Sequence, residues 1–361
     1  MTDDAALPIA LDLMGGDLGV DVLLQGALRA VVDDHARVVV VGLPGIGARV
    51  ARDHAALVAA GRLAFVDADD VVTMDDRPAA AVRTKRRSSM RVACELVQSG
   101  RCAAVLSTGN SGAFSATASF VFGRLDGVVR PAIAAPVPSL GRSGHAILLD
   151  AGANVDCTPL QLAQWGVLGS AYLARTTGHP RPAIGVLGNG EEEHKGTALT
   201  RGALALLRQT DLHVTGPCEG RDLLHGAVDV VVTDGFTGNV ALKTAEGVVA
   251  FMGQLVKDTF GNGSVVDRLG GALSKPGWDR IRARLDPRET GAAPLLGLRR
   301  PAFVAHGRSD AHAVRCGIRA ARRFVALDVE RALADALARN PGVRRAAPKM
   351  NPSSSMTSST S

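Results

Sequence analysis

The sequence predicts an α/β fold built on a doubly wound, Rossmann-like sheet with helices on both faces. Short, almost wholly apolar runs rich in Val, Ile and Leu recur along the chain, as expected for parallel strands that are covered on both sides. Segments rich in Ala and Leu separate these runs, and each is long enough for a crossover helix. Loops that combine Gly with Asn, Asp or a hydroxyl residue follow the runs, at the position where α/β sheets bind their ligands.

The apolar runs are the expected strands. In chain order they cover residues 8–14, 37–43, 63–68, 103–108, 145–152, 183–188 and 228–235. The expected crossover helices cover residues 20–32, 88–99, 159–175 and 197–209. Because runs and helical segments alternate throughout, we expect a single α/β domain over residues 1–340. Residues 341–361 are rich in Ser, Thr and Pro without apolar periodicity, which is typical of a disordered tail.

Composition excludes several classes of protein. Only 3% of the 361 residues are aromatic, so a base-stacking platform for nucleic acid is not expected, although Lys and Arg outnumber Asp and Glu by 41 to 35. The pI near 9.4 favours an anionic partner without identifying it. The five cysteines include no C-x-x-C pair, and no secretory signal pattern is present, which favours a reducing, cytoplasmic setting. No apolar run reaches the ~18 residues of a membrane span.

The loops after the apolar runs carry the candidate ligand-binding residues. They cover residues 12–17 (DLMGGD), 107–112 (STGNSG), 150–156 (DAGANVD), 187–196, 233–243 and 305–313. Gly permits close backbone approach, and Asn, Ser and Thr donate neutral hydrogen bonds that suit phosphate or carbonyl oxygens. Where a helix follows, its N-terminal N–H groups favour an anion. Any one loop is equally well explained as an ordinary strand-to-helix connection, but the set indicates an anion site at one sheet edge.

Common cofactor and nucleophile motifs are missing from the sequence. Residues 41–50 (VGLPGIGARV) read G-x-x-G-x-G, which is not a dinucleotide fingerprint, and no G-x-x-x-x-G-K-[ST] loop occurs. Adjacent side chains in 191–194 (EEEH) diverge and cannot all reach one metal ion. There is no G-x-S-x-G elbow, and Cys94 and Cys102 fit buried structural thiols. We therefore expect no cofactor and no metal.

Taken in order and spacing, these loops resemble the phosphate acyltransferase family PlsX, from about residue 9 to residue 329. The segments that carry the resemblance are ALDLMGGD (10–17), RSSMRVA (87–93), STGNSGA (107–113), LLDAGANVD (148–156), EGRDLL (219–224), VTDGFTGNVALKTAEG (232–247) and GAAPLLGL with AHGRSDA (within 291–311). The family makes acyl-phosphate from acyl-[acyl carrier protein] and inorganic phosphate in bacterial phospholipid synthesis. Its fold is similar to that of phosphotransacetylases and isocitrate-dehydrogenase-like enzymes.

The resemblance implies a set of site residues. Phosphate must attack a thioester carbonyl, so the site needs donors for the dianion and for the developing oxyanion. A strong general acid is less necessary, because the thiol of the leaving group has a pKa near ~8.5. The implied catalytic residues are Asn154, Lys195, Asn239 and His306, with both Asn side chains polarising the carbonyl or its oxyanion. The implied phosphate- or substrate-binding residues are Asp12, Gly15, Gly16, Asp17, Lys85, Ser88, Asn110, Ser111, Gly112, Asp234, Gly235 and Ser309.

Some features of this chain depart from the family or leave alternatives open. Arg87, Gly188 and Arg308 stand where relatives usually carry other residues. His306 taken alone is better explained as a structural histidine. The same fold could also serve a phosphotransacetylase-like enzyme that uses acyl-CoA, or a non-catalytic protein that binds acyl groups or phosphate.

The resemblance and the charge pattern also suggest partners. Residues 83–91 (RTKRRSSMR) place five basic residues in nine positions, which suits an acidic acyl carrier protein, although such a run is also typical of a solvated helix start. Relatives are homodimers. We expect an amphipathic helical segment at about 253–288 to project from the domain, with 261–285 contacting the inner face of the membrane reversibly and meeting the downstream membrane acyltransferase there. For residues 248–256 a core or dimer interface is the better interpretation.

Overall fold

The strands of the computed structural model, which describes residues 7–192 and 194–344, form two sheets. The first has the order β3 (Leu63–Asp67), β2 (Val38–Gly42), β1 (Ile9–Asp12), β4 (Ala104–Ser107), β12 (Ala302–Val304), β11 (Ala293–Leu296) and β5 (Ala132–Ile133). The second has the order β6 (Ala135–Pro138), β7 (His145–Leu149), β10 (Val230–Val232), β8 (Ala183–Leu187) and β9 (His213–Cys218). Neighbours pair in parallel except at β11 and β6, each of which runs antiparallel to the strands beside it.

One short segment joins the two sheets. Residues 132–138 leave the first sheet as β5 and enter the second as β6. The backbone N–H of Ile133 donates to Oδ1 of Asp150 (2.8 Å), and the N–H of Ala151 donates to the carbonyl of Ile133 (3.1 Å). The carboxyl end of β7 therefore lies against the first sheet.

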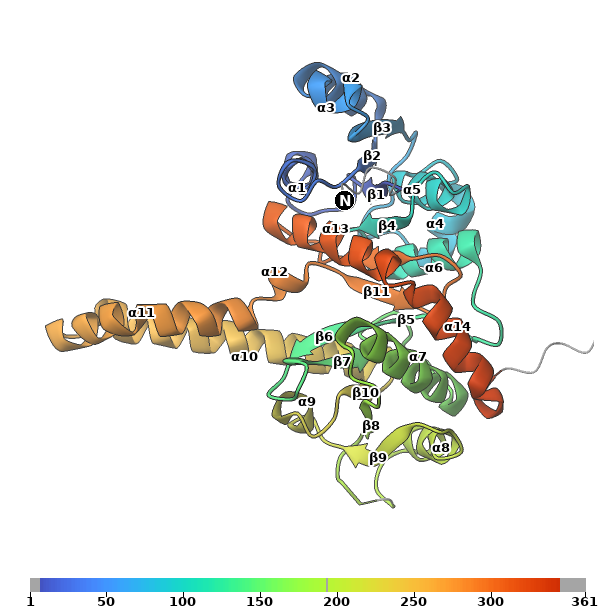
Figure 1. Cartoon of the computed structure of the whole chain (residues 1–361), viewed down its shortest axis with the longest axis vertical. Helices are drawn as coiled ribbons and strands as arrows, with labels where there is room; N and C mark the ends of the chain where they lie inside the picture. The colour runs from blue at the N-terminus through green and yellow to red at the C-terminus, as the bar shows by residue number, and fades with distance from the viewer. Residues whose placement is uncertain (1–6, 193, 345–361) are drawn as a thin grey trace, which may run out of the picture.

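Helices cover both faces of the sheets (Figure 1). They are α1 (Val20–Asp33), α2 (Pro44–Asp53), α3 (Ala55–Ala59), α4 (Pro78–Thr84), α5 (Ser89–Gln98), α6 (Ser111–Phe122), α7 (Pro159–Thr177), α8 (Ala198–Leu207), α9 (Asp222–His225), α10 (Gly235–Asn262), α11 (Val265–Leu285), α12 (Pro287–Thr290), α13 (Ala311–Ala326), α14 (Val329–Arg339) and the 3₁₀ turn η1 (Pro341–Val343). Along β1, Leu11 packs into the core that includes α1 and α13, while Ala10 packs into the core that includes α5 and α6. Both faces are buried, which is why the strand sequences are almost wholly apolar.

Helix α7 lies at the centre of the molecule. Thr158 and Gln161 form a capping box at its start, and Gly178 ends it in the left-handed conformation (φ 74°). Its fully buried Trp165 belongs to the core cluster shared by both sheets, and the indole Nε1 donates to the carbonyl of Arg130 (2.9 Å). This shared core holds the two sheets together.

Helices α10 and α11 extend away from the body as an antiparallel hairpin (Figure 1). The 28 residues of α10 correspond to a length of roughly 40 Å. Ser264 and Asp267 form a capping box at the turn, and the rings of Phe260 and Trp278 lie 6.3 Å apart between the helices. No residue of α11 is buried. Within the described part of the chain, no helix has both the length and the apolar character needed to cross a membrane.

The predicted α/β fold class is confirmed, and so are the seven predicted strands and four predicted crossover helices, each within a few residues. The strands divide between two sheets instead of one, because the short strands β5, β6 and β11 redirect the chain and have no long apolar run of their own. The fold also continues past residue 340. Val343 is 1% exposed, and its carbonyl accepts a hydrogen bond from Gln164 (2.9 Å). Residues 345–361 of the predicted tail lie outside the described residues.

Candidate functional site

The loops after β1, β4 and β12 meet at the carboxyl edge of the first sheet. A Cβ at Gly15 would lie 2.5 Å from the backbone of Gly109, so these two loops pack backbone against backbone. The N–H of Asp17 donates to the carbonyl of Gly307 (2.8 Å), which fastens the first loop to the third. The absence of side chains at Gly15 and Gly109 therefore lets the two loops pack closely, and the approach of a ligand to these glycines stays a prediction. Ser309 is buried, and its N–H donates to the carbonyl of His306 (2.9 Å).

Asp12 lies buried beneath this edge. It accepts hydrogen bonds from Ser107 Oγ (2.8 Å) and from the N–H of Met14 (3.1 Å), and Ser89 is a further partner. Burial raises the pKa of Asp12, and these hydrogen bonds oppose the rise. Ser88, the predicted residue, is also buried, but the side chain that bonds to Asp12 belongs to the next residue, Ser89.

The N-terminus of α6 is the most favourable place for an anion. Its cap is the neutral Asn110, whose Oδ1 accepts from the N–H of Ala113 (3.0 Å), whereas α10 and α13 are capped by the carboxylates of Asp234 and Asp310. A carboxylate cap offsets the positive end of the helix dipole, and a neutral cap leaves it available. The N–H groups of the first turn, including those of Ser111 and Gly112, point out of the helix end.

A buried hydroxyl without a partner lies beside this helix end. Among the described residues, only Thr108 Oγ1 and Ser143 Oγ are buried without a hydrogen-bond partner. A Cβ at Gly16 would lie 3.0 Å from Thr108 Oγ1, so Gly16 leaves space above the hydroxyl. An unsatisfied buried hydroxyl is uncommon in a native fold, and a ligand oxygen would satisfy it.

Lys85 and the side-chain amide of Asn110 hold the loop of residues 70–76. The Nζ of Lys85 donates to Asp76 Oδ2 (2.7 Å) and to the carbonyl of Val71 (2.6 Å). The hydrogen bond from Lys85 lowers the pKa of Asp76. The Nδ2 of Asn110 donates to the carbonyls of Met74 (3.0 Å) and Asp76 (3.1 Å). These two side chains therefore shape the wall of the site, and their charge and amide groups are engaged within the protein.

The second sheet contributes Asp150 and Asn154. The fully buried Asp150 accepts from Asn154 Nδ2 (2.9 Å) and from the N–H of Asn154 (2.7 Å). Burial raises the pKa of Asp150, and hydrogen bonds from Asn154, Ile133 and Ala153 oppose the rise. Asn154 Nδ2 also donates to the carbonyl of Pro131 (2.8 Å), so its amide is committed to the loop. This arrangement fits a residue that positions the site.

Helix α10 begins at this loop and reaches across to the first sheet. The N–H of Gly235 donates to the carbonyl of Asn154 (2.7 Å), and Asp234 caps the helix. Asn239 is exposed and lies beside Gly152, whose Cβ would be 3.6 Å away. Two turns from its start, α10 presents Lys243.

The contact between Lys243 and His306 joins the two halves of the site. Lys243 Nζ lies 2.9 Å from His306 Nε2 and 2.8 Å from Glu246 Oε2. Burial and the charge of Lys243 lower the pKa of His306, whereas Glu246 and Asp17 oppose the shift. The lowered pKa favours the neutral form of the imidazole. His306 projects from a first-sheet loop and α10 follows a second-sheet strand, so this contact spans the junction between the sheets.

Lys195 is the one predicted catalytic residue that the structure does not bring to this junction. Within the described residues its Nζ pairs with Glu192 Oε2 (2.7 Å) in its own loop, beside a small cavity of about 10 Å³ that Gly188 also lines. Glu191 pairs with Arg221 (2.7 Å) and not with Lys195, so Glu191 and Glu192 point in different directions. Arg87 pairs with Asp69 at the surface (2.8 Å), and Arg308 is exposed beside His306.

Four residues of this site escaped the sequence-based selection: Ser89, Thr108, Asp150 and Lys243. All four lie inside the motifs quoted above. Position within a motif does not show which of its side chains take part in the site. The signal for Lys243 was its place two turns after the start of a helix that follows a site loop, which puts it on the same helix face as Asn239 and Gly235.

A family model described as fatty acid synthesis protein matches residues 7–332. A phosphate acyltransferase of Anaeromyxobacter sp. (strain Fw109-5) is 49% identical over 87% of this chain and 86% of its own length. A phosphate acyltransferase of Geobacillus sp. (strain WCH70) is 41% identical over 92% and 99% respectively.

Solved structures show a similar fold. A phosphotransacetylase from Streptococcus pyogenes has a TM-score of 0.55 at 15% identity and covers 90% of this chain and 96% of its own. A branched-chain phosphotransacylase from Enterococcus faecalis V583 has a TM-score of 0.54 at 13% identity and covers 88% and 99%. At such identities the likeness concerns the fold alone.

Proposed function

This chain belongs to the fatty acid synthesis protein family, whose relatives over most of its length are phosphate acyltransferases, and from that premise we propose a reaction for it. The enzyme transfers the acyl group of an acyl-[acyl carrier protein] to inorganic phosphate. The products are acyl-phosphate and free carrier protein, which places the reaction early in bacterial phospholipid synthesis. The match to phosphate acyltransferases across about nine-tenths of the chain carries the proposal.

The edge of the first sheet suits the phosphate. The N–H groups at the start of α6 and the unpartnered hydroxyl of Thr108 supply hydrogen-bond donors, and the neutral cap Asn110 leaves the helix dipole free to attract an anion. Gly15 lets the first loop pack against Gly109, and Gly16 lets the anion approach the backbone beside Thr108. Lys85 keeps the loop of residues 70–76 in place beside these donors through Asp76.

The junction between the sheets suits the acyl transfer. A phosphate oxygen forms a bond to the thioester carbon, the carbonyl oxygen takes the electron pair, and the collapse of this adduct expels the thiolate. In this proposal the exposed amide of Asn239 donates to the carbonyl oxygen, and Asn154 holds the loop behind it. His306, neutral beside Lys243, accepts the proton that phosphate loses and returns it to the leaving sulfur.

Product analysis tests the reaction. The purified chain is incubated with phosphate and either acyl-[acyl carrier protein] or acyl-CoA, and acid-labile acyl-phosphate and free thiol are measured. The proposal expects equal amounts of both products, with the carrier protein as the better acyl donor. Product from acyl-CoA alone would indicate a phosphotransacetylase-like enzyme, and no product from either donor would indicate a binding protein.

We propose that part of the basic run at residues 83–91 contacts the acidic carrier protein. Three of its five charges are already paired within the described residues: Lys85 with Asp76, Arg87 with Asp69 and Arg91 with Glu95. Arg83 and Arg86 donate to backbone carbonyls of their own segment. These two guanidinium groups therefore provide the attraction for an acidic partner.

Charge reversal tests this contact. Arg86→Glu should raise the KM for acyl-[acyl carrier protein] and weaken its dependence on salt, because charge attraction mainly steers encounter. Arg101→Glu is the matched control, since Arg101 is also exposed but lies at the opposite end of α5. Equal KM values for both variants would exclude this surface as the contact site of the carrier protein.

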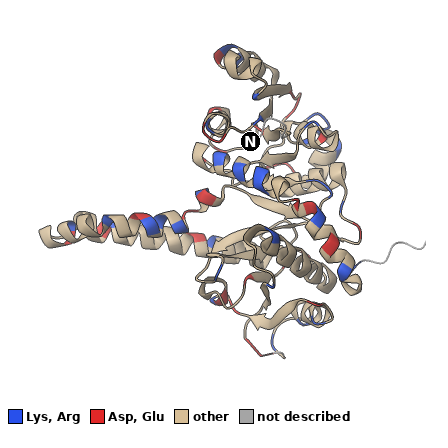
Figure 2. Cartoon of the chain, in the orientation of Figure 1, with Lys and Arg blue, Asp and Glu red and all other residues tan. Residues whose placement is uncertain are grey.

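We propose that residues 261–285 of the hairpin contact the membrane and that residues 248–256, whose apolar side chains are exposed or half-buried and not in the core, contribute to a homodimer. Exposed apolar side chains lie along both helices, including Phe251 and Met252 on α10 and Val265, Leu269 and Leu273 on α11. Large exposed apolar patches mark interaction sites. Lys275 pairs with Asp279, and Arg284 is bound to the carbonyl of Ser139 at the base of the hairpin. Figure 2 accordingly shows both signs of charge on the hairpin, so apolar contact is the main support for the proposal.

Vesicle binding tests the membrane contact. Leu269→Glu with Leu273→Glu should abolish co-sedimentation with anionic vesicles while acyl transfer in solution persists, because both side chains are more than half exposed. Val32→Glu with Leu140→Glu adds the same charge at exposed apolar positions outside the hairpin and should leave binding intact. If the hairpin variant still binds the vesicles, the apolar face of α11 is not the membrane-contact surface. Sedimentation of the same variants in the absence of vesicles measures whether each variant is a monomer or a dimer.

A further inference from the structure

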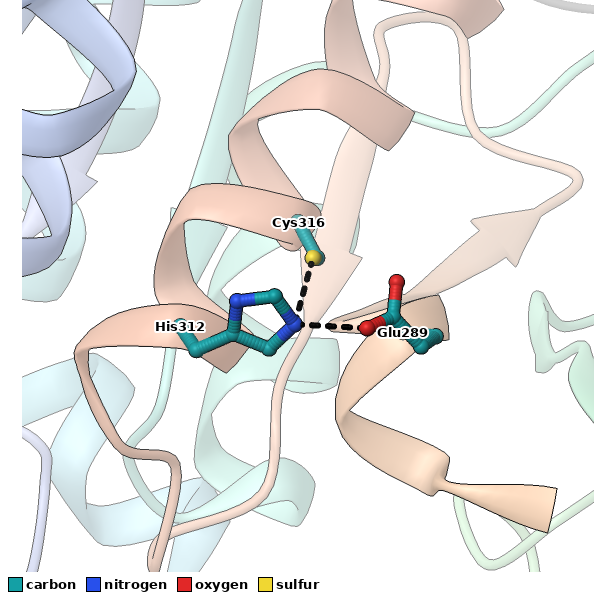
Figure 3. A group of neighbouring side chains, drawn as sticks. All are labelled: Glu289, His312 and Cys316. Carbon is teal, nitrogen blue, oxygen red and sulfur yellow. Dashed lines mark hydrogen bonds and ion pairs between the residues drawn. The ribbon is translucent and has the colours of Figure 1, made fainter. Parts of the chain in front are cut away.

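A cluster of potential metal ligands lies away from the acyl-transfer site, at the base of the projecting hairpin. Among the described residues, Glu289, His312 and Cys316 are the one group of this kind in which each side chain offers a ligand atom within 4.8 Å of the others. Glu289 lies on α12, directly after the hairpin returns to the body, and the other two residues lie on α13 (Figure 3). His312 and Cys316 are four residues apart, so they share one face of their helix.

The ligand atoms converge on one point. Glu289 Oε1 lies 2.8 Å from His312 Nε2, and Cys316 Sγ lies 3.6 Å from the same nitrogen (Figure 3). In a relay of acid, imidazole and thiol, the acid and the thiol must approach opposite ring nitrogens. Here both approach Nε2, which excludes a relay and suits three ligands around a single ion.

The distances suit tetrahedral zinc. Ordinary Zn–S, Zn–N and Zn–O bond lengths at tetrahedral angles separate S from N by about 3.6 Å and N from O by about 3.4 Å. The S···N separation of 3.6 Å already agrees. The N···O separation of 2.8 Å must lengthen by roughly half an ångström, which requires only a rotation of Glu289, whose side chain is 48% exposed.

The surrounding contacts hold the two helices in place independently of the cluster. Arg288 donates to Asp286 (2.6 Å) and to Asp310 (3.1 Å), the residue that caps α13. A Cβ at Gly291 would lie 2.5 Å from the carbonyl of Ala313, so the chain after α12 packs directly on α13. These contacts hold Glu289 beside α13 without a metal ion, and such preorganisation favours metal binding.

We propose that Glu289, His312 and Cys316 bind a zinc ion that fastens the return of the hairpin to α13. One thiolate and one carboxylate neutralise the charge of Zn²⁺, and a neutral imidazole completes a donor set that zinc commonly uses. The fourth position faces solvent beside the half-exposed Glu289 and accepts water. The site stabilises the base of the hairpin and takes no part in acyl transfer. A result that rules out zinc binding would therefore leave the proposed reaction unaffected.

The position of Arg319 gives the proposal a directional test. Its Nη2 lies 3.3 Å from Cys316 Sγ and 3.8 Å from Glu289 Oε2, so the guanidinium competes with a cation for the same two ligands. Binding of Zn²⁺ with release of the thiol proton adds one positive charge to the cluster, which Arg319 opposes. Arg319→Gln should therefore tighten zinc binding by roughly fivefold, as expected for removing one charge at about 4–5 Å in water.

Direct metal binding tests the site in the full chain. After treatment with chelator, Zn²⁺ is titrated against a chromophoric competitor, and Co²⁺ is added separately to record absorption. We expect one Zn²⁺ per chain, a higher melting temperature with Zn²⁺, and a thiolate-to-Co²⁺ charge-transfer band. Cys316→Ser should abolish the band, and His312→Ala should weaken binding at least about tenfold.

Matched variants separate this site from chance binding. Cys102→Ala removes a buried thiol and His213→Ala an exposed imidazole outside the cluster, and both should bind zinc like the unaltered chain. Glu289→Gln alters an exposed side chain and should fold normally while binding zinc more weakly. A Co²⁺ band that persists in Cys316→Ser, or zinc affinity equal in the unaltered chain and Glu289→Gln, would overturn the proposal. Looser binding by Arg319→Gln would also count against it.

Discussion

Gly235 stands where α10 meets the loop that holds Asp150 and Asn154, so Gly235→Ala probes the packing of the proposed site. A Cβ there would lie 2.5 Å from the carbonyl oxygen of Asn154 and 2.8 Å from Asp150 Oδ2. Ordinary contacts begin near 3.4 Å, so the helix end must retreat by about 0.9 Å. Neither neighbour yields easily, because one is backbone and the other is a buried carboxylate held by several hydrogen bonds.

The expected cost follows from these contacts. Overfilling a packed interior destabilises a protein by about 1–3 kcal/mol. Retreat of the helix also breaks the 2.7 Å hydrogen bond from the Gly235 N–H to Asn154, which contributes about 1 kcal/mol. We therefore expect the free energy of unfolding to fall by about 2–4 kcal/mol. Because α10 also carries Asn239 and Lys243, a shift of this size should lower kcat/KM by roughly a hundredfold.

Urea unfolding and acyl-phosphate formation, measured on the same preparations, check both expectations. Gly247→Ala is the control, because Gly247 lies on the same helix and an added Cβ meets no atom within 4 Å. That variant should gain up to about 1 kcal/mol from helix propensity and keep its activity. If Gly235→Ala unfolds at the same urea concentration as Gly247→Ala and keeps its kcat/KM, the proposed close packing at the start of α10 is refuted.

Three further predictions concern single side chains of the site. Lys243→Met removes the charge that helps to lower the pKa of His306, so that pKa should rise and the acid limb of kcat/KM should move to higher pH. Lys257→Met, farther along α10, should leave the profile unchanged, and an unmoved limb in Lys243→Met would remove His306 as the titrating group. Thr108→Val removes the unpartnered hydroxyl, so stability should stay constant or rise, while the KM for phosphate should increase about tenfold or more. Ser143→Ala removes the other unpartnered hydroxyl, and an equal KM for both variants would contradict a ligand role for Thr108. Asn154→Leu deprives the buried Asp150 of a donor and should destabilise the fold by about 1–3 kcal/mol at neutral pH. Burial raises the folded-state pKa of Asp150, so its ionisation costs stability as pH rises through that pKa, and the variant should lose less stability in mild acid; a loss independent of pH would contradict this account.

The basic run at residues 83–91 and the hairpin show what sequence patterns can predict and what they cannot. The run at 83–91 correctly locates a basic segment, but only the fold shows that Lys85, Arg87 and Arg91 are already paired with acids. Likewise, helical spacing identifies the apolar face of 265–273, but spacing cannot distinguish a face that meets the core from one that meets solvent. That distinction depends on where the hairpin leaves the body, which distant residues such as Ser139 decide through Arg284.

The sequence by itself determined the α/β class, the strands of both sheets that are buried on two sides, and the loops at their carboxyl ends. Burial on both faces of a sheet requires apolar runs, and close approach of the backbone requires Gly. Both features can therefore be recognised from the local sequence. Tertiary structure alone decided that two sheets form, that Lys195 stays in its own loop, and that Lys243 meets His306. These outcomes depend on contacts between residues far apart in the chain. A short strand such as β5, or a lysine on an exposed helix face, acquires its role only from a partner that local sequence does not specify.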